Sequence, residues 1–183
     1  MKKLMLFSVL LWTLTAPASG QRFFTRDARV HFSSDAPVEK NEAINKSGTA
    51  VIDTKTGNME WKVLIKNFIF EKALMQEHFN ENYMESTKYP SSTFKGSLSD
   101  PTSVNFSKDG TYPVKAKGTL EIHGVKKEIE VPGSITVSGG TLKINSTFII
   151  ACADFNIQIP GVVRDKIAKE INVSVDATLN PLK

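Results

Sequence analysis

Cysteine is almost absent from this chain, which has one, Cys152, among its 183 residues. A single cysteine excludes an internal disulfide, so the hydrophobic core has to stabilise the fold unaided. Asp154 is the only acidic residue close to Cys152 in sequence. A cysteine nucleophile needs a neighbouring base, and none is evident here. We therefore expect Cys152 to be a buried, unreactive thiol.

Residues that could carry catalysis or hold a metal are also few. The three histidines, His31, His78 and His123, lie in separate segments, and none has a second ligand at metal-binding spacing. The sequence has no nucleophile elbow, phosphate loop or dinucleotide fingerprint. Only Glu71 and Glu77 are placed to assist His78. We expect no metal site, no catalytic residue and no enzymatic activity, and for His78 and His123 a hydrogen bond to nearby backbone is the simpler interpretation.

A large charge of one sign is lacking too. The formal net charge is +4, and it falls to +2 without the first twenty residues, which hold two lysines and no acid. Lys126 and Lys127 lie between Glu121 and Glu128, an arrangement typical of a solvated outer face. The charge distribution therefore does not indicate a nucleic-acid partner.

The one long apolar run lies at the N-terminus. Lys2 and Lys3 precede apolar residues 4–14, and small residues follow at 16–20. This order is typical of a secretory signal peptide over residues 1–20. The run is too short to span a bilayer comfortably. We expect residues 21–183 to form a single exported domain, periplasmic or secreted, without an integral membrane segment after cleavage.

Apolar and polar residues alternate through most of residues 21–183, which is the pattern of half-buried strands. The clearest run places Trp61, Val63 and Ile65 on one face. Turn signals, such as residues 108–110 and 138–141, separate successive runs. About eight strands, joined mostly by hairpins, predict an all-β fold that closes into an extended antiparallel barrel. The inward side chains are predicted to include Trp61, Val63, Phe94, Leu120, Phe148 and Val175.

Three places depart from simple alternation. Residues 35–46 are polar and contain one proline, which predicts a loop. Gly96 lies inside an alternating run and predicts a bend or a close approach of two strands. Pro132 interrupts another run, and because proline has no N–H for a ladder hydrogen bond, it predicts a strand end or a sheet edge.

Residues 68–94 have helical rather than two-residue periodicity. A helix over about residues 71–83 would place Met75, His78 and Phe79 in one stripe, with Leu74 and Tyr83 at its margins. A proline further along the chain ends this helix. An inserted α-helix of this kind could close a barrel channel, and flexible methionine beside flat phenylalanine suits contact with a variable ligand.

Several motifs in this stretch and after it belong together. His78-Phe79 is followed by Tyr83-Met84, by Tyr89-Pro90 with Phe94, and by the run Gly118-x-Leu120-x-Ile122-His123-Gly124-Val125. Their order and spacing resemble the YceI-like family of exported bacterial proteins. The match is most specific in residues 74–96 and 114–126. The chain departs from the family pattern near His31 and Phe32, and Cys152 has no counterpart in it.

The resemblance implies a lipocalin-like barrel that binds a polyisoprenoid or another long amphipathic lipid in its central channel. The partner it implies is thus a hydrophobic lipid, and beyond a bound isoprenoid or fatty-acid-like lipid no cofactor is expected. The protein is expected to be a monomer or a homodimer. The residues expected to contact the lipid are Trp61, Val63, Phe68, Phe70, Leu74, Met75, His78, Phe79, Tyr83, Phe94 and Phe148.

Two other functions remain open on the sequence. A barrel with a filled core would act through a protein partner, and it would show no cavity and an exposed apolar patch. A lipid-processing enzyme would need an acid–base pair, for which His78 with Glu71 or Glu77 is the only local candidate. Glu77 would lie on another face of the helix than His78 and is poorly placed for that role.

Overall fold

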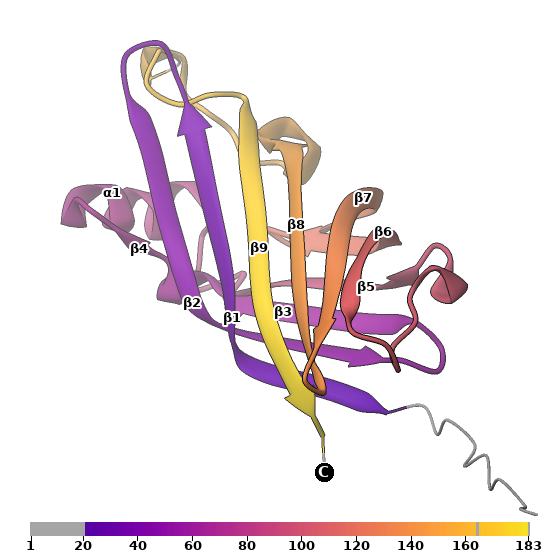
Figure 1. The fold of residues 1–183 in the computed structure, drawn as a ribbon. Coiled ribbons are helices and arrows are strands. Elements are labelled where there is room, and N and C mark those ends of the chain that lie inside the picture. The colour runs from indigo at the N-terminus through magenta and orange to yellow at the C-terminus, as the bar shows by residue number, and fades with distance from the viewer. Residues whose placement is uncertain (1–20, 164, 183) are drawn as a thin grey trace, which may run out of the picture.

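The computed structural model describes residues 21–163 and 165–182, so the predicted signal peptide, residues 1–20, lies outside the described residues. Eight antiparallel strands form a closed barrel in the order β1-β9-β8-β7-β6-β5-β3-β2, and β2 pairs back onto β1 (Figure 1). The predicted antiparallel barrel is therefore confirmed. The strands are β1 Arg22–Asp35, β2 Lys40–Asp53, β3 Asn58–Leu64, β5 Ser91–Leu98, β6 Gly110–Ile122, β7 Val125–Ser138, β8 Thr141–Ala151 and β9 Glu170–Pro181.

The predicted loop over residues 35–46 is wrong, because β2 begins at Lys40 and pairs with β1 over most of its length. The inward positions in this part of β2 are Ala43 and Asn45, which are small or polar and conceal the alternation. Asn45 is 0% exposed, yet both its amide nitrogen and its amide oxygen make hydrogen bonds. Its amide donates to the Leu64 carbonyl at 2.9 Å, and its oxygen accepts from the Ser47 N–H at 2.9 Å. A buried polar residue satisfied in this way can belong to a strand.

The inserted helix has two parts. An α-helix, α1 Ala73–His78, continues directly into a π-helical turn, η2 Phe79–Tyr83. The predicted helix over residues 71–83 is thus present from Ala73 onward. The two-residue strand β4, Ile69–Phe70, precedes it and pairs with β2. The remaining short elements are 3₁₀ turns, η1 Ile65–Asn67, η3 Pro101–Ser103, η4 Cys152–Phe155 and η5 Gly161–Val163. In the described part of the chain, no helix has the length and apolarity to cross a membrane.

The barrel interior is filled at one end and hollow at the other. We call the filled part the packed end; its buried cluster lies near the 139–140 turn and the described chain ends and consists of Phe23, Ala28, Ala50, Ile52, Met59, Leu98, Val104, Ile135, Val137, Leu142, Ile144, Ala177 and Leu179. At the hollow end, inward residues such as Trp61, Val63 and Phe148 are only half-buried. The predicted register holds, because Lys62 and Lys115 are exposed and Asp176 lies on the outer surface with Lys143.

Gly96 marks a close approach of β5 and β6, as predicted. It pairs with Gly118, and a Cβ atom added to Gly96 would lie 2.3 Å from the Lys117 carbonyl oxygen. A Cβ on Gly118 would in turn lie 2.4 Å from Cα of Gly96. Two glycines facing one another therefore let the strands approach more closely than side chains allow.

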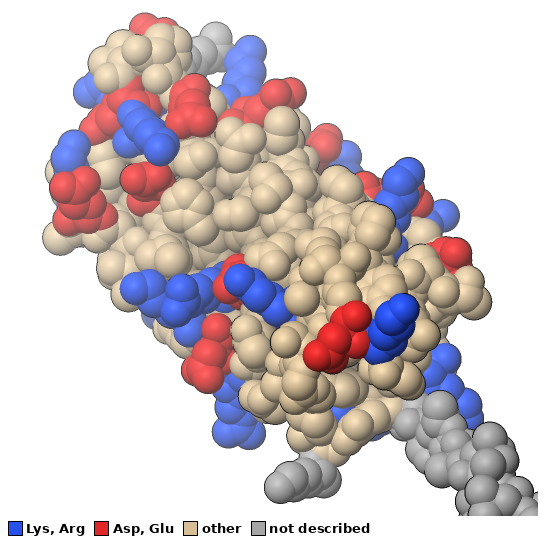
Figure 2. Space-filling model, viewed as in Figure 1, with Lys and Arg blue, Asp and Glu red and all other residues tan. Residues whose placement is uncertain are grey.

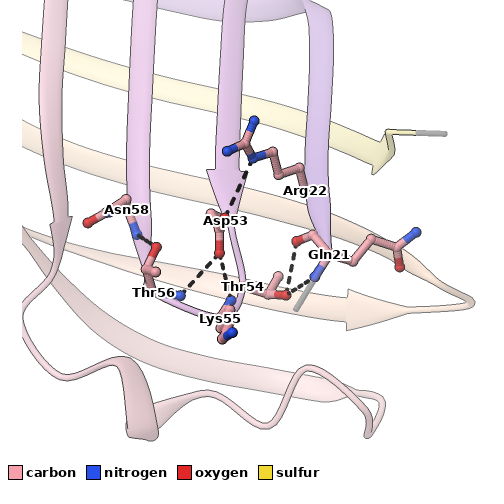
Figure 3. A network of polar contacts seen from close by, with 7 residues as sticks. All are labelled: Gln21, Arg22, Asp53, Thr54, Lys55, Thr56 and Asn58. Carbon is pink, nitrogen blue, oxygen red and sulfur yellow. Dashed lines mark hydrogen bonds and ion pairs between the residues drawn. The ribbon is translucent and has the colours of Figure 1, made fainter. Parts of the chain in front are cut away.

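A polar network fastens the start of β1 to the β2–β3 turn at the packed end (Figure 3). The N–H groups of Lys55 and Thr56 donate to Oδ1 of Asp53 at 2.9 and 3.1 Å. Nε of Arg22 lies 3.6 Å from Oδ2 of the same carboxylate. These interactions, led by the Thr56 backbone hydrogen bond, lower the pKa of Asp53. The described end of the chain joins the same region, where the Leu182 N–H donates to the Arg22 carbonyl at 2.7 Å.

We predict that Asp53→Ala lowers the free energy of unfolding at neutral pH by about 1 kcal/mol, because two backbone N–H groups of the turn lose their side-chain acceptor. Because the folded-state pKa of Asp53 is lowered, its contribution is present above the unfolded-state pKa and is lost as the pH falls through the folded-state value. Urea unfolding of both proteins should show the difference shrinking in acid. Asp27→Ala, at an exposed position on β1, is the control, and an equal loss there would contradict the prediction.

Candidate ligand-binding cavity

The hollow end contains a cavity of about 600 Å³, lined almost entirely by apolar side chains. All eleven residues that the sequence singled out lie in its wall: Trp61, Val63, Phe68, Phe70, Leu74, Met75, His78, Phe79, Tyr83, Phe94 and Phe148. The strands supply Trp61, Phe94 and Phe148 because these positions face inward in the barrel register. The helical insertion, residues 73–83, forms one side of the cavity with Leu74, Met75, His78, Phe79 and Tyr83. The sequence therefore located the lining, and whether these residues contact a ligand stays a prediction.

An aromatic cluster forms the wall beside the insertion. Phe32 of β1 stacks on Phe79 with ring centroids 5.4 Å apart, and it also contacts Phe68 and Phe70 at 5.4 and 5.8 Å. Phe79 contacts Phe70 at 5.0 Å. Aromatic pairs at these spacings add attraction beyond the burial of their area. The cluster attaches the helical insertion to the barrel and presents ring faces and edges to the cavity.

The helical stripe is inward-facing but not buried. Met75, Phe79 and Tyr83 line the cavity and are half-buried, and Leu74 is 61% exposed. In a filled barrel such residues would be packed out of reach of solvent. Partial burial of Tyr83 raises the pKa of its hydroxyl. The insertion is therefore a wall over open space rather than a seal over a packed core.

Polar contacts surround the opening between the insertion and the β1–β2 hairpin, which we call the mouth. Lys72 Nζ lies 2.9 Å from Oε1 of Glu39, so an ion pair joins the start of α1 to the hairpin. Asn41 donates to the Lys166 carbonyl at 2.6 Å, which joins the hairpin to the segment after η5. All four residues line the cavity. On the face shown in Figure 2, acidic and basic side chains lie side by side without a patch of one sign.

His123 and His78 have different surroundings. His123 Nδ1 lies 3.1 Å from the Phe155 carbonyl oxygen, and Nε2 lies 2.9 Å from Oε2 of Glu85. Both ring nitrogens are therefore engaged, one with backbone and one with a side chain. The simpler interpretation is thus right for His123, which joins the β6–β7 turn to η4 and to the end of the insertion. In the described residues the His78 ring makes no hydrogen bond, and it lies exposed in the cavity wall.

Cys152 is buried, as predicted, and burial raises the pKa of its thiol. A raised pKa leaves little reactive thiolate at neutral pH. Among the described residues, no group of three or more histidine, cysteine, aspartate or glutamate side chains is close enough to hold a metal ion. The wall can therefore exclude water and pack against apolar groups, and few of its side chains could take part in catalysis or bind a metal.

Sequence reasoning missed several wall residues, including Phe32, Ile129, Val131 and Ile150. The alternation did place Phe32 on the apolar side of its strand, and the same pattern applies to Ile129 and Val131. The missing information was how much of each inward face borders the cavity and how much borders the packed core. That depends on the three-dimensional path of the strands.

Fold and cavity together define a lipocalin-like antiparallel barrel with an apolar interior. The YceI-like domain family matches residues 12–179, and the chain belongs to this family. No curated protein matches the sequence.

Solved structures share the fold at low identity. A polyisoprenoid binding domain from Saccharophagus degradans, implicated in plant cell wall breakdown, has a TM-score of 0.75 at 13% identity, over 89% of this chain and 99% of that one. BcnA of Burkholderia cenocepacia has a TM-score of 0.68 at 16% identity, over 83% and 95%. The YceI protein of Campylobacter jejuni has a TM-score of 0.55 at 16% identity, over 100% and 99%. Likeness at these identities shows the fold alone.

The two histidines give a paired prediction. His123→Ala should lower the free energy of unfolding by about 1–3 kcal/mol, because it removes two hydrogen bonds and leaves the Phe155 carbonyl without this donor. His78→Ala should change stability by less than about 0.5 kcal/mol, as is usual for exposed positions. Urea unfolding of both variants measures the difference. Equal effects on stability would contradict the assignment of His123 as the structural histidine.

Proposed function

We propose that this protein is exported and binds a polyisoprenoid or a similar long amphipathic lipid in the cavity. The observation that carries this proposal is an apolar cavity of about 600 Å³ in a barrel whose other end is packed. Pockets that hold small molecules commonly have volumes of about 300–1,000 Å³. The fold shared with a polyisoprenoid binding domain supports the choice of ligand class.

The cavity suits a chain better than a compact polar ligand. Burying each methylene group contributes about 0.8 kcal/mol, so a long tail binds without a strong polar anchor. Phe79 and Phe94 offer flat surfaces, and Met75 can adjust its rotamer to the shape of the chain. Polar side chains at the mouth include Glu39, Asn41 and Lys72, beside which the head of an amphipathic lipid could remain in water.

The alternatives fit the described residues less well. The packed end alone could stabilise a barrel that acts only through a protein partner. Such a barrel would have no need of a hollow end. An enzyme would need an acid–base pair in the wall. His78 lies in the wall, but in the described residues no carboxylate contacts its ring. Export rests on the N-terminal pattern of residues 1–20 and on the family.

The first test is direct analysis of the bound lipid. We predict that the protein, produced with its own N-terminal segment and purified without detergent, carries a polyisoprenoid or another long-chain lipid. Mass spectrometry of an organic extract identifies it, and an extract of an unrelated protein purified in parallel is the control. Absence of extracted lipid, together with no uptake of an added polyprenol, would contradict the proposal.

A second test separates wall from core. We predict that Met75→Asp and Phe79→Asp retain the barrel but lose bound lipid, since the carboxylate can remain hydrated in an open cavity. Leu142→Asp is the control, because Leu142 is 0% exposed in the packed end. An unpaired carboxylate there costs several kcal/mol or more and should unfold the protein. Circular dichroism and lipid content are measured on the same samples.

Two outcomes would contradict this assignment of the insertion. Loss of the β signal in both cavity variants would mean that the stripe belongs to a packed core. A retained fold with full lipid content would mean that the ligand is held elsewhere.

A further inference from the structure

The wall of the barrel is not continuous between β7 and β8. The two strands pair from Ser138 and Thr141 as far as Gly133 and Ser146, and there the ladder stops. Beyond this point, residues 125–132 of β7 remain paired with β6, and residues 147–151 of β8 remain paired with β9. In this region β7 is therefore hydrogen-bonded only to β6, and β8 only to β9. The edges of β7 and β8 that face each other are not paired. Pro132 lies where the separation begins, in agreement with the sheet edge that its missing N–H predicts.

Side chains on both sides of this separation line the cavity. Ile129, Val131 and Pro132 do so from β7, and Ser146, Phe148 and Ile150 do so from β8. We call this gap in the pairing the window. The inward residues beside it, Ile129, Val131, Phe148 and Ile150, are only half-buried.

The paired part of the same strands provides an internal comparison. Inward residues there are well buried: Ile135 and Leu142 are 0% exposed and Ile144 is 6% exposed. Both sets lie on the inner face of the same two strands. The inward residues beside the window are thus more exposed than those in the paired part of the same strands, so the window borders the hollow end and not the packed end.

The window has a fixed frame. At its narrow end the Ser146 hydroxyl donates to the Pro132 carbonyl at 2.6 Å. At its wide end η4 crosses from β8 towards β7, where Lys127 Nζ lies 2.8 Å from Oδ1 of Asp154. The contact between His123 and the carbonyl of Phe155, the next residue, holds the same end of η4. Side-chain contacts therefore bound the unpaired stretch at both ends, unlike the frayed end of a hairpin.

We propose that the window is the route by which the lipid enters and leaves the cavity, sideways through the barrel wall. This inference rests on the proposed lipid-binding function and adds a path to it. Apart from Ser146 at the narrow end, the inward side chains named beside the window are apolar, so a chain passing between them stays in contact with apolar groups. The facing strand edges carry backbone N–H and C=O groups outside any ladder, which a polar head group can use in transit.

The mouth is the alternative route for the lipid, but polar contacts across the mouth oppose the passage of an apolar chain. The Glu39–Lys72 ion pair and the hydrogen bond from Asn41 to the Lys166 carbonyl tie its sides together. An apolar chain entering there has to pass or break these polar contacts. A chain entering through the window leaves every one of them in place.

Cross-linking distinguishes the two routes. In a Cys152→Ala background, cysteines replace Glu130 and Ile149, which would be partners if the β7–β8 ladder continued. Both point outward, and Ile149 is 61% exposed. A flexible bis-maleimide then joins them across the window. The matched control joins Thr136→Cys to Lys143→Cys, which are already ladder partners, and a third protein joins Glu39→Cys to Lys72→Cys across the mouth.

The measurement is the rate at which a fluorescently labelled polyprenol leaves and enters each protein. We expect the window cross-link to slow both rates by about tenfold or more without a matching change in affinity, because it obstructs the route and not the bound state. The control cross-link and the mouth cross-link should leave both rates within about twofold of the unmodified protein.

Unchanged rates across the window, or slowing only across the mouth, would overturn the proposed route while leaving lipid binding intact. Failure of the unmodified protein to bind the probe would overturn lipid binding itself, and this inference with it. The window, ladder and mouth cross-links, compared with the unmodified protein, therefore distinguish a wrong entry route from an absence of lipid binding.

Discussion

Closure of the sheet through β1 is the constraint on which the rest of the molecule depends. Because β1 pairs with β2 on one side and with β9 on the other, the order of paired strands closes on itself, although the β2–β3 and β7–β8 ladders cover only part of their strands. A closed ladder fixes the shape of the wall without requiring that every part of the interior be filled. Dense packing at one end can then supply stability while the other end remains hollow. One end of the barrel thus provides stability, and the other end provides the cavity.

The hollow end needs a further support, because eight strands alone would leave its side open next to β2. β3 pairs with only part of β2, and the two residues of β4 continue that edge before the chain enters α1 and η2. Phe32, Phe68, Phe70 and Phe79 then join the insertion to the strands by ring contacts. Aromatic packing, and not a β-ladder, therefore joins this part of the cavity wall to the strands.

Alternation of apolar residues was enough to predict the barrel, its register and the strand residues of the cavity wall, because most strands here have one dry and one wet face. The other predicted wall residues came from the helical periodicity within residues 68–94, and their expected contact with a lipid came from the resemblance to the YceI-like family. Alternation failed at the first half of β2, where buried Asn45 is satisfied by Leu64 and Ser47, partners that are set by the fold and not by periodicity. It gave only a hint of the window. Pro132 indicated an edge, but the separation of β7 from β8 depends on where η4 is held, through His123 and Lys127, by contacts between residues distant in sequence.

The hydrogen bond between Leu182 and Arg22 places the two ends of the described chain side by side at the packed end. Both the mouth and the window lie away from them. A linker, an affinity tag or a surface attachment joined at either end would therefore leave the cavity openings unobstructed. The same proximity makes the barrel a suitable scaffold for circular permutation, since a short linker could join these ends and new ones could be opened in an exposed turn.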